Sequence, residues 1–320
     1  MTENLYYQEF MSVIRQKIPH KATLANTITE LLDVDKDAVY RRLRGEVNFS
    51  FTEMAHIARK LGVSLDKVAG IENVQSRPAQ MNLSNQVSPT AIDYEMFNGH
   101  IDLLKSIRDE PETQIMEASN IIPHYLYQDY EYLTRYHIFR WNHAGFHGDV
   151  LNYDEIEISE KLRLLQKENC ECARHISSTT YVWDNMLFQR LAANIKYFTK
   201  VRLISEADAA LIKNDLLMLL ENLQNIAIKG KHEDTGKNVS IFISDVASDT
   251  NYSCLKSKNI HLTLLRAFVL NATVTFDIEV FKMASAWIRS MQQKATLISV
   301  SGEKMRAMYF EQQLEIVNTI

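Results

Sequence analysis

Residues 24–62 read LANTITELLDVDKDAVYRRLRGEVNFSFTEMAHIARKLG, and the organisation of the first quarter of the chain follows from them. Apolar residues at helical spacing predict a helix that ends at Leu32. The run Asp33-Val34-Asp35 breaks this helix, and a short cationic helix is predicted over 36–44, stopped by Gly45. A small domain that holds one cationic helix outward has the shape needed to enter the major groove of DNA.

Further helices flank this stretch and complete a domain over residues 1–73. Apolar periodicity predicts helices over 5–18 and 52–61, and Pro19 ends the first of them. A last short helix closes at Gly70. We therefore expect five short helices, which suffice for a small domain with its own core.

The short helix over 36–44 has two faces. Val39 and Leu43 lie one turn apart and are expected in the core. The side chains expected to face DNA are Lys36, Tyr40, Arg41 and Arg44. An arginine that donates two hydrogen bonds to guanine is the commonest base-specific contact, and Lys36 or Tyr40 can touch base edges or phosphates.

The helix that precedes it offers a second contact to DNA. Thr23 or Asn26 can cap its N-terminus, where free backbone N–H groups can hold a phosphate. Asp35 is expected to cap the short cationic helix in the same way, through its carboxylate.

The run DAVYRRLRGE at 37–46, followed by SFTEMAHIARKLGVSLDKV at 50–68, resembles the lambda-repressor-like (Xre-type) helix-turn-helix family, most closely its bacterial BetR-type variant. In that family the recognition helix ends in Arg or Asn plus Gly, and the next helix ends in a Leu-Gly-Val-Ser pattern. Here these are Arg44-Gly45 and Leu61-Gly62-Val63-Ser64, and the resemblance covers residues 1–75.

This resemblance implies a bacterial transcriptional regulator that binds double-stranded DNA through the helix over 36–44. Two positions depart from the family: Asp33 stands where Gly is common, and Thr29 where Ala is common. One head reads only a few base pairs, so a homodimer on half-sites about 34 Å apart is expected. The alternative is a protein-interaction module whose helix-turn-helix head no longer binds DNA.

Residues 74–89 (VQSRPAQMNLSNQVSP) are rich in Pro, Ser, Asn and Gln and predict a linker. Residues 90–320 then predict an α+β domain for dimerisation, for sensing a small-molecule or protein effector, or for both. The expected fold is mainly α with a small antiparallel sheet. It comprises an N-terminal five-helix lambda-repressor-like domain and the larger α+β domain.

The second domain contains segments whose apolar residues recur at strand spacing and others in which they recur at helical spacing. Alternation of apolar and polar residues predicts strands over 113–120, 239–245, 251–256 and 260–268. Helical spacing predicts helices over 91–108, 121–139, 152–177, 178–198, 207–228, 277–295 and 302–318. The long helices over 152–177 and 302–318 are candidate dimer surfaces.

Composition is that of an ordinary globular protein, with 46% hydrophobic and 23% charged residues and a net charge of −5. The first 75 residues carry 10 cationic and 10 anionic side chains, so the acidic excess lies in the remainder. Three cysteines fit a reducing compartment. Neither a signal peptide nor a long apolar run is visible, so we expect a cytoplasmic protein with no membrane partner.

Enzyme signatures are missing from the sequence. It contains no phosphate-binding glycine loop, no nucleophile elbow and no HExxH motif, so we expect no catalytic residues, no cofactor and no enzyme. His143 and His147 have helical metal-ligand spacing, but Gly145 between them disfavours a helix, and no metal site is expected. Cys170 and Cys172 are expected to be structural.

Two other segments allow more than one interpretation. The aromatic stretch from Tyr125 to Trp141 fits either a core helix or the wall of a ligand pocket, and core is the more common outcome. The run His232-Glu233-Asp234 lies in a polar turn and is expected to be solvated.

Overall fold

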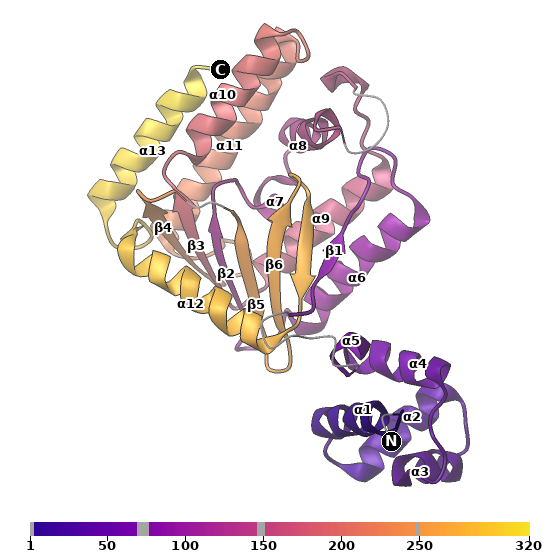
Figure 1. Ribbon diagram of the computed structural model, residues 1–320. Helices are drawn as coiled ribbons and strands as arrows, with labels where there is room; N and C mark the ends of the chain where they lie inside the picture. Colours follow the sequence, from indigo (N-terminus) through magenta and orange to yellow (C-terminus); the bar gives the residue numbers. More distant parts are fainter. Residues whose placement is uncertain (1–2, 69–76, 146–150, 248–249) are drawn as a thin grey trace. The chain divides into compact units, whose positions relative to one another are not determined.

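The chain divides into two units after Pro78 in the computed structural model, which describes residues 3–68, 77–145, 151–247 and 250–320 (Figure 1). Unit 1 is Met1–Pro78 and unit 2 is Ala79–Ile320. Each unit has a hydrophobic core of its own.

Unit 1 is built from helices. They are α1 (Glu3–Lys17), α2 (Lys21–Leu32), α3 (Lys36–Arg44), α4 (Phe51–Leu61) and α5 (Leu65–Val68). The Ser50 side chain accepts from the Glu53 backbone N–H, and the Glu53 carboxylate accepts from the Ser50 backbone N–H, so α4 begins with a capping box. Phe10, Ile28 and Val39 are fully buried in the core, and burial of such a side chain stabilises by about 1.5–3 kcal/mol.

Unit 2 alternates helices and strands. Its first half contains β1 (Gln80–Asn82), α6 (Ala91–Ile107), β2 (Gln114–Ser119), α7 (His124–Tyr127), α8 (Glu131–His143), η1 (Tyr153–Glu155), α9 (Glu160–Arg174) and β3 (Ser178–Asp184). Its second half contains α10 (Leu187–Lys200), α11 (Glu206–Lys229), β4 (Asn238–Ser244), β5 (Tyr252–Lys256), β6 (His261–Ala267), β7 (Asn271–Thr275), α12 (Ile278–Lys294), β8 (Thr296–Leu297) and α13 (Glu303–Asn318).

The expected small antiparallel sheet is wrong, because the strands form one eight-stranded mixed sheet in the order β1-β7-β6-β5-β2-β3-β4-β8. The three strands β2, β3 and β4 are parallel, and the other pairs are antiparallel. The fold is therefore α+β with a large sheet at its centre. The error came from β3, whose residues 178–184 were expected to begin a helix but are buried on both faces and show no alternation.

Helices cover both faces of this sheet (Figure 1). On one face α12 packs through Phe281 and Ile288 against Met116 and Cys254. The other face is covered in two parts: α8, α10, α11 and α13 lie over β3 and β4, while α6 and α9 lie over β2, β5 and β6.

The second half of the expected linker belongs to unit 2. Residues 80–82 form β1, which pairs with β7, and the Ser84 backbone N–H donates to Asn271 Oδ1 at 2.9 Å. The Asn85 backbone N–H donates to Asp93 Oδ1, and Thr90 begins α6 with a capping box. These bonds fix the segment along the edge of the sheet.

Candidate nucleic-acid interface

Two residues in the left-handed conformation flank α3, one at the end of the preceding helix and one at its own C-terminus. Asp33, at the end of α2, has a φ of 50°, and Gly45, at the end of α3, has a φ of 79°. The Glu46 N–H donates to the Arg41 carbonyl at 3.0 Å, which closes the last turn. Asp35 occupies the N-cap position of α3, as expected. Its carboxylate accepts no cap hydrogen bond, so the expectation that it caps the helix through its side chain is wrong.

Contacts from neighbouring helices fix α3 in place. Arg15 of α1 donates from Nη2 to the Leu43 carbonyl at 2.7 Å, and so satisfies an otherwise open carbonyl at the C-terminus of α3. Arg42 donates to Glu53 of α4 at 2.9 Å and lies over the Phe49 ring. Arg42 thus binds the protein, whereas Arg41 and Arg44 are exposed to solvent.

The residues expected to face DNA differ in exposure. Lys36, Arg41 and Arg44 are exposed on α3, whereas Tyr40 is half-buried and packs against the core of unit 1. The structure therefore leaves three cationic side chains of α3 on the surface.

Thr23 and Asn26 are both exposed on α2, but neither caps it. Helix α2 begins at Lys21, so its N-cap is His20, which makes no cap hydrogen bond through its side chain. Thr23 lies in the first turn, and its Oγ1 is 3.2 Å from His20 Nδ1. The expectation that Thr23 or Asn26 caps this helix is wrong, because the helix begins at Lys21, before its first buried apolar residue, Leu24.

Glu46 pairs with two of the three exposed cations. Arg44 Nε donates to Glu46 Oε1 at 2.6 Å, and Arg41 Nε lies 3.5 Å from Glu46 Oε2. The hydrogen bond from Arg44 is the main cause that lowers the pKa of Glu46; desolvation opposes it, and the charges of Arg44 and Arg41 add to the lowering. All three side chains are about half exposed, so solvent screens these pairs and an outside anion can replace Glu46.

Sequence reasoning missed Arg15 and Glu46, which orient or neutralise the expected readers of DNA. Glu46 directly follows the glycine that ends α3 and lies two residues from Arg44, so the sequence alone could have predicted this ion pair. Arg15 acts across 28 residues of sequence, and no local signal marks it.

The other motifs of the sequence give no metal centre among the described residues. His143 ends α8, whereas His147 lies outside the described residues. Cys170, Cys172 and Cys254 are free and buried. Within the ranges that the structure describes, no group of three or more His, Cys, Asp or Glu side chains could hold a metal ion.

The aromatic stretch from Tyr125 to Trp141 divides into α7 and α8 and lies mainly in the core. Tyr127, Tyr136 and Trp141 are buried, and Tyr127 stacks on His137 with ring centroids 4.0 Å apart. The interpretation of this stretch as core is confirmed.

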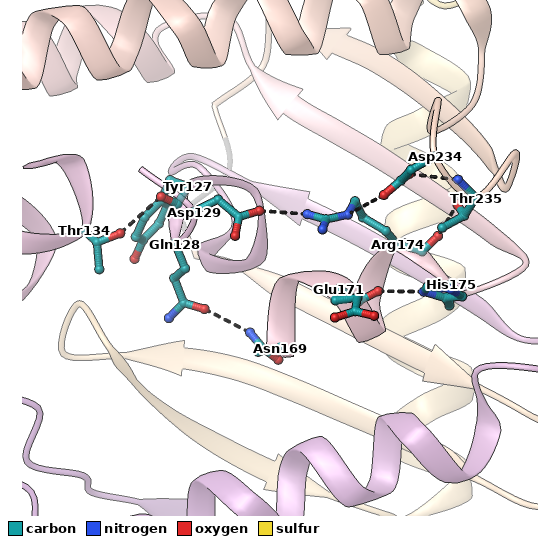
Figure 2. A network of polar contacts seen from close by, with 10 residues as sticks. All are labelled: Tyr127, Gln128, Asp129, Thr134, Asn169, Glu171, Arg174, His175, Asp234 and Thr235. Atoms are coloured by element: carbon teal, nitrogen blue, oxygen red, sulfur yellow. Dashed lines mark hydrogen bonds and ion pairs between the residues drawn. The ribbon is translucent and has the colours of Figure 1, made fainter. Parts of the chain in front are cut away.

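The turn after α11, residues 230–237, is hydrogen-bonded to Arg174 at the end of α9 (Figure 2). Arg174 donates from Nη1 to Asp129 at 2.8 Å and from Nε to Asp234 at 3.0 Å. The carbonyl of Arg174 accepts from Thr235 Oγ1 at 2.6 Å. His232 is only 5% exposed, so the expectation of a solvated run is wrong for His232, whereas Glu233 and Asp234 are exposed as expected.

Burial of His232 predicts a loss of stability in acid. Burial lowers the pKa of His232 from 6.5 to about 4, although the Asp234 charge raises it and the Arg174 charge opposes that rise. Below pH 6.5 His232 binds a proton in the unfolded chain, whereas in the folded chain it stays neutral until about pH 4. The free energy of unfolding therefore falls as the pH falls. The loss from this residue is expected to be about 2 kcal/mol between pH 7 and pH 5.

Urea unfolding at several pH values, followed by the fluorescence of the buried Trp141 and Trp183, measures this loss. His232→Gln cannot titrate in this range and should show a flatter dependence on pH than the wild type. Equal slopes for the two proteins would contradict the assignment.

Among the described residues, no helix combines the length and the apolar character that crossing a bilayer requires. Comparison of the chain with protein-family models, with curated proteins and with solved structures finds no match.

Proposed function

We propose that this protein is a bacterial transcriptional regulator that binds double-stranded DNA through α3 and acts in the cytoplasm. One observation carries the proposal: α3 is held at its C-terminal end by Arg15 and Arg42, buries Val39 and leaves three cations exposed. The resemblance of residues 37–68 to lambda-repressor-like helix-turn-helix domains supports it. Arg41 and Arg44 are assigned to base edges, and Lys36 to a base edge or a phosphate.

Two other elements complete the proposed interface. Tyr40 is half-buried, so its ring supports α3 while its hydroxyl can reach a phosphate. The start of α2 supplies free backbone N–H groups near the exposed Thr23 and Asn26, and these suit a phosphate of the same strand. The proposal includes a homodimer, because two heads on a palindrome bind a longer site.

A second candidate is a protein-interaction module that no longer binds DNA. The pairing of Arg41 and Arg44 with Glu46 favours it, because an acidic residue beside the readers repels phosphates. The DNA-binding proposal requires that both arginines exchange Glu46 for DNA.

Selection of bound sequences from random DNA with the full-length protein tests the proposal. We expect a palindromic motif whose half-sites are about one helical turn apart, and binding that weakens steeply with salt because phosphate contacts release counterions. An absence of enrichment would sink the proposal and leave the interaction module. Sedimentation of the protein with and without the selected DNA measures the dimer.

Glu46→Gln is expected to strengthen binding to the selected DNA by about threefold, because an exposed ion pair contributes little and its loss frees both arginines. Fluorescence anisotropy at low and moderate salt measures the change. Glu30→Gln, which removes one exposed charge from α2, is the matched control. Weaker binding by Glu46→Gln would mean that Glu46 orients the arginines for DNA rather than competing with it.

A further inference from the structure

Unit 2 contains a cavity of about 300 Å³ on the sheet face opposite α12. Its roof comes from α6 and α9, and its floor comes from β6, β7 and β1. The strand register sets the floor in rows: Arg266 pairs with Ala272, which pairs with Asn82, and the next row contains Leu264, Val274 and Gln80. Alternate residues of three strands therefore face one space.

The floor of the cavity is most polar at the β6–β7 turn and more apolar farther along β6, whereas the roof also contributes the polar Gln166 and Asn169. Arg266 and Asn271 lie at the β6–β7 turn, with Ser84 beside Asn271. Leu262 lies four residues back along β6, about 13 Å away at the rise of a strand, and Leu165 of α9 also lines the space. A ligand that fits this gradient has a polar head and an apolar body.

Arg266 is the one charged side chain among the described residues that line this cavity. Its Nη1 donates to the Val269 carbonyl at 3.1 Å, and its Nη2 lies 2.8 Å from His124 Nδ1. Burial first, and then the Arg266 charge, holds the pKa of His124 well below its usual range, so the neutral ring accepts this bond. His124 thus adds no charge of its own.

A carboxyl group that interacts with Arg266 lies in a smaller adjoining cavity, which Arg266 also lines. This is Glu117, which accepts a hydrogen bond from the Tyr125 hydroxyl at 2.6 Å. Burial raises the pKa of Glu117, and the hydrogen bond from Tyr125 followed by the Arg266 charge only partly offsets the rise. The cavity therefore presents a positive charge with no acidic side chain among its described lining, and an anion complements it.

Two buried amide groups also lack an acceptor. Asn271 is 2% exposed and Gln166 is 5% exposed, and neither Asn271 Nδ2 nor Gln166 Nε2 has a hydrogen-bond partner. The orientation of Asn271 is fixed, because its Oδ1 accepts from the Ser84 backbone N–H, which can only donate. A buried N–H without a partner is costly, so an acceptor oxygen that reaches either group would be stabilising.

We propose that this cavity binds a small monocarboxylate with an apolar body. The carboxylate accepts from Arg266 and Asn271 at the turn end, and the body lies between α6 and α9 over Leu262 and Leu264. At about 300 Å³, the space lies at the lower end of the range for small-molecule sites. This site is independent of the DNA-binding proposal and gives unit 2 a ligand of defined chemistry.

Gly99 supports the assignment and supplies a variant. It lies in the interior of α6, where glycine is less stable than alanine by about 0.5–1 kcal/mol. A Cβ atom at this position would meet nothing within 4 Å, so packing does not require the glycine. Gly99 lines the cavity, and a larger side chain there takes space from a ligand without a clash at Cβ.

Calorimetric titration of the full-length protein with octanoate, and separately with octan-1-ol, tests the proposal. Both probes are kept below the concentrations at which they aggregate. Octanoate is expected to bind one molecule per chain, about tenfold or more tighter than the alcohol, because charge-assisted hydrogen bonds are the stronger ones. Equal affinity for the two probes, or no binding of octanoate, would overturn the proposal.

Variants locate the site. Arg266→Leu is expected to remove the preference for octanoate and leave octan-1-ol binding unchanged, whereas Gly99→Leu weakens both. Arg289→Leu, on the opposite face of the sheet, is the matched control and should bind like the wild type. Octanoate binding that survives both Arg266→Leu and Gly99→Leu would place the ligand elsewhere and overturn the assignment.

Discussion

Replacement of Arg41 and Arg44 together by alanine is expected to lower affinity for the selected DNA by about 100-fold, because two arginine contacts to base edges are lost. Both side chains lie on the exposed face of α3 and reach no other part of unit 1 than Glu46 in the described contacts. The fold should therefore survive the change. Binding to unrelated DNA should fall less, since base contacts discriminate among sequences and phosphate contacts do not.

Fluorescence anisotropy with the selected DNA and with a scrambled duplex measures both effects. Lys60→Ala removes an exposed charge from the end of α4 and is the control for a general loss of positive charge. Circular dichroism of the double variant verifies that its helices persist. Unchanged affinity of the double variant for the selected DNA would show that α3 does not read the bases.

Gly302→Ala is expected to destabilise unit 2 by about 3 kcal/mol. Gly302 has a φ of 77° at the start of α13, a conformation that costs an alanine about 1–2 kcal/mol. A Cβ atom there would also lie 2.6 Å from the Leu297 carbonyl oxygen, and backbone cannot move aside as a side chain can. Because α13 buries Tyr309 and Phe310 against the core, a displaced helix start disturbs that packing.

Gly236→Ala is the matched control for this substitution. Gly236 has a φ of 68°, but its Cβ would meet nothing within 4 Å, so only the conformational cost applies. Urea unfolding followed by tryptophan fluorescence reports on unit 2, because all three tryptophans lie beyond residue 140. Similar losses for the two variants would mean that the connection before α13 relaxes around the new methyl group.

The sequence predicts the elements whose signals are local. Residues 36–44 were expected as a helix and form α3 with the same ends, because the preceding break and Gly45 fix both. Residues 239–245 alternate and form β4 within one residue of the expectation. The edge strands β1 and β8 are two or three residues long and carry no periodicity that could have revealed them.

Non-local pairing accounts for what the sequence could not predict. Parallel alignment of β2 with β3 depends on partners more than 60 residues apart, so no local pattern encodes it. The same holds for the cavity, where Asn82, His124 and Arg266 come from distant parts of unit 2. Each looks like an ordinary polar residue until the strand register brings it to a common space.

The pairing of β1 with β7 also has a consequence for the order of folding during synthesis. A ribosome that adds about 5–20 residues per second needs about 10–40 s to proceed from Asn82 to Thr275. Contacts within unit 1 are short in sequence, so the nascent helices can assemble in that interval. Unit 1 of the nascent chain can therefore be folded for many seconds before β7, the partner strand of β1, has been synthesised.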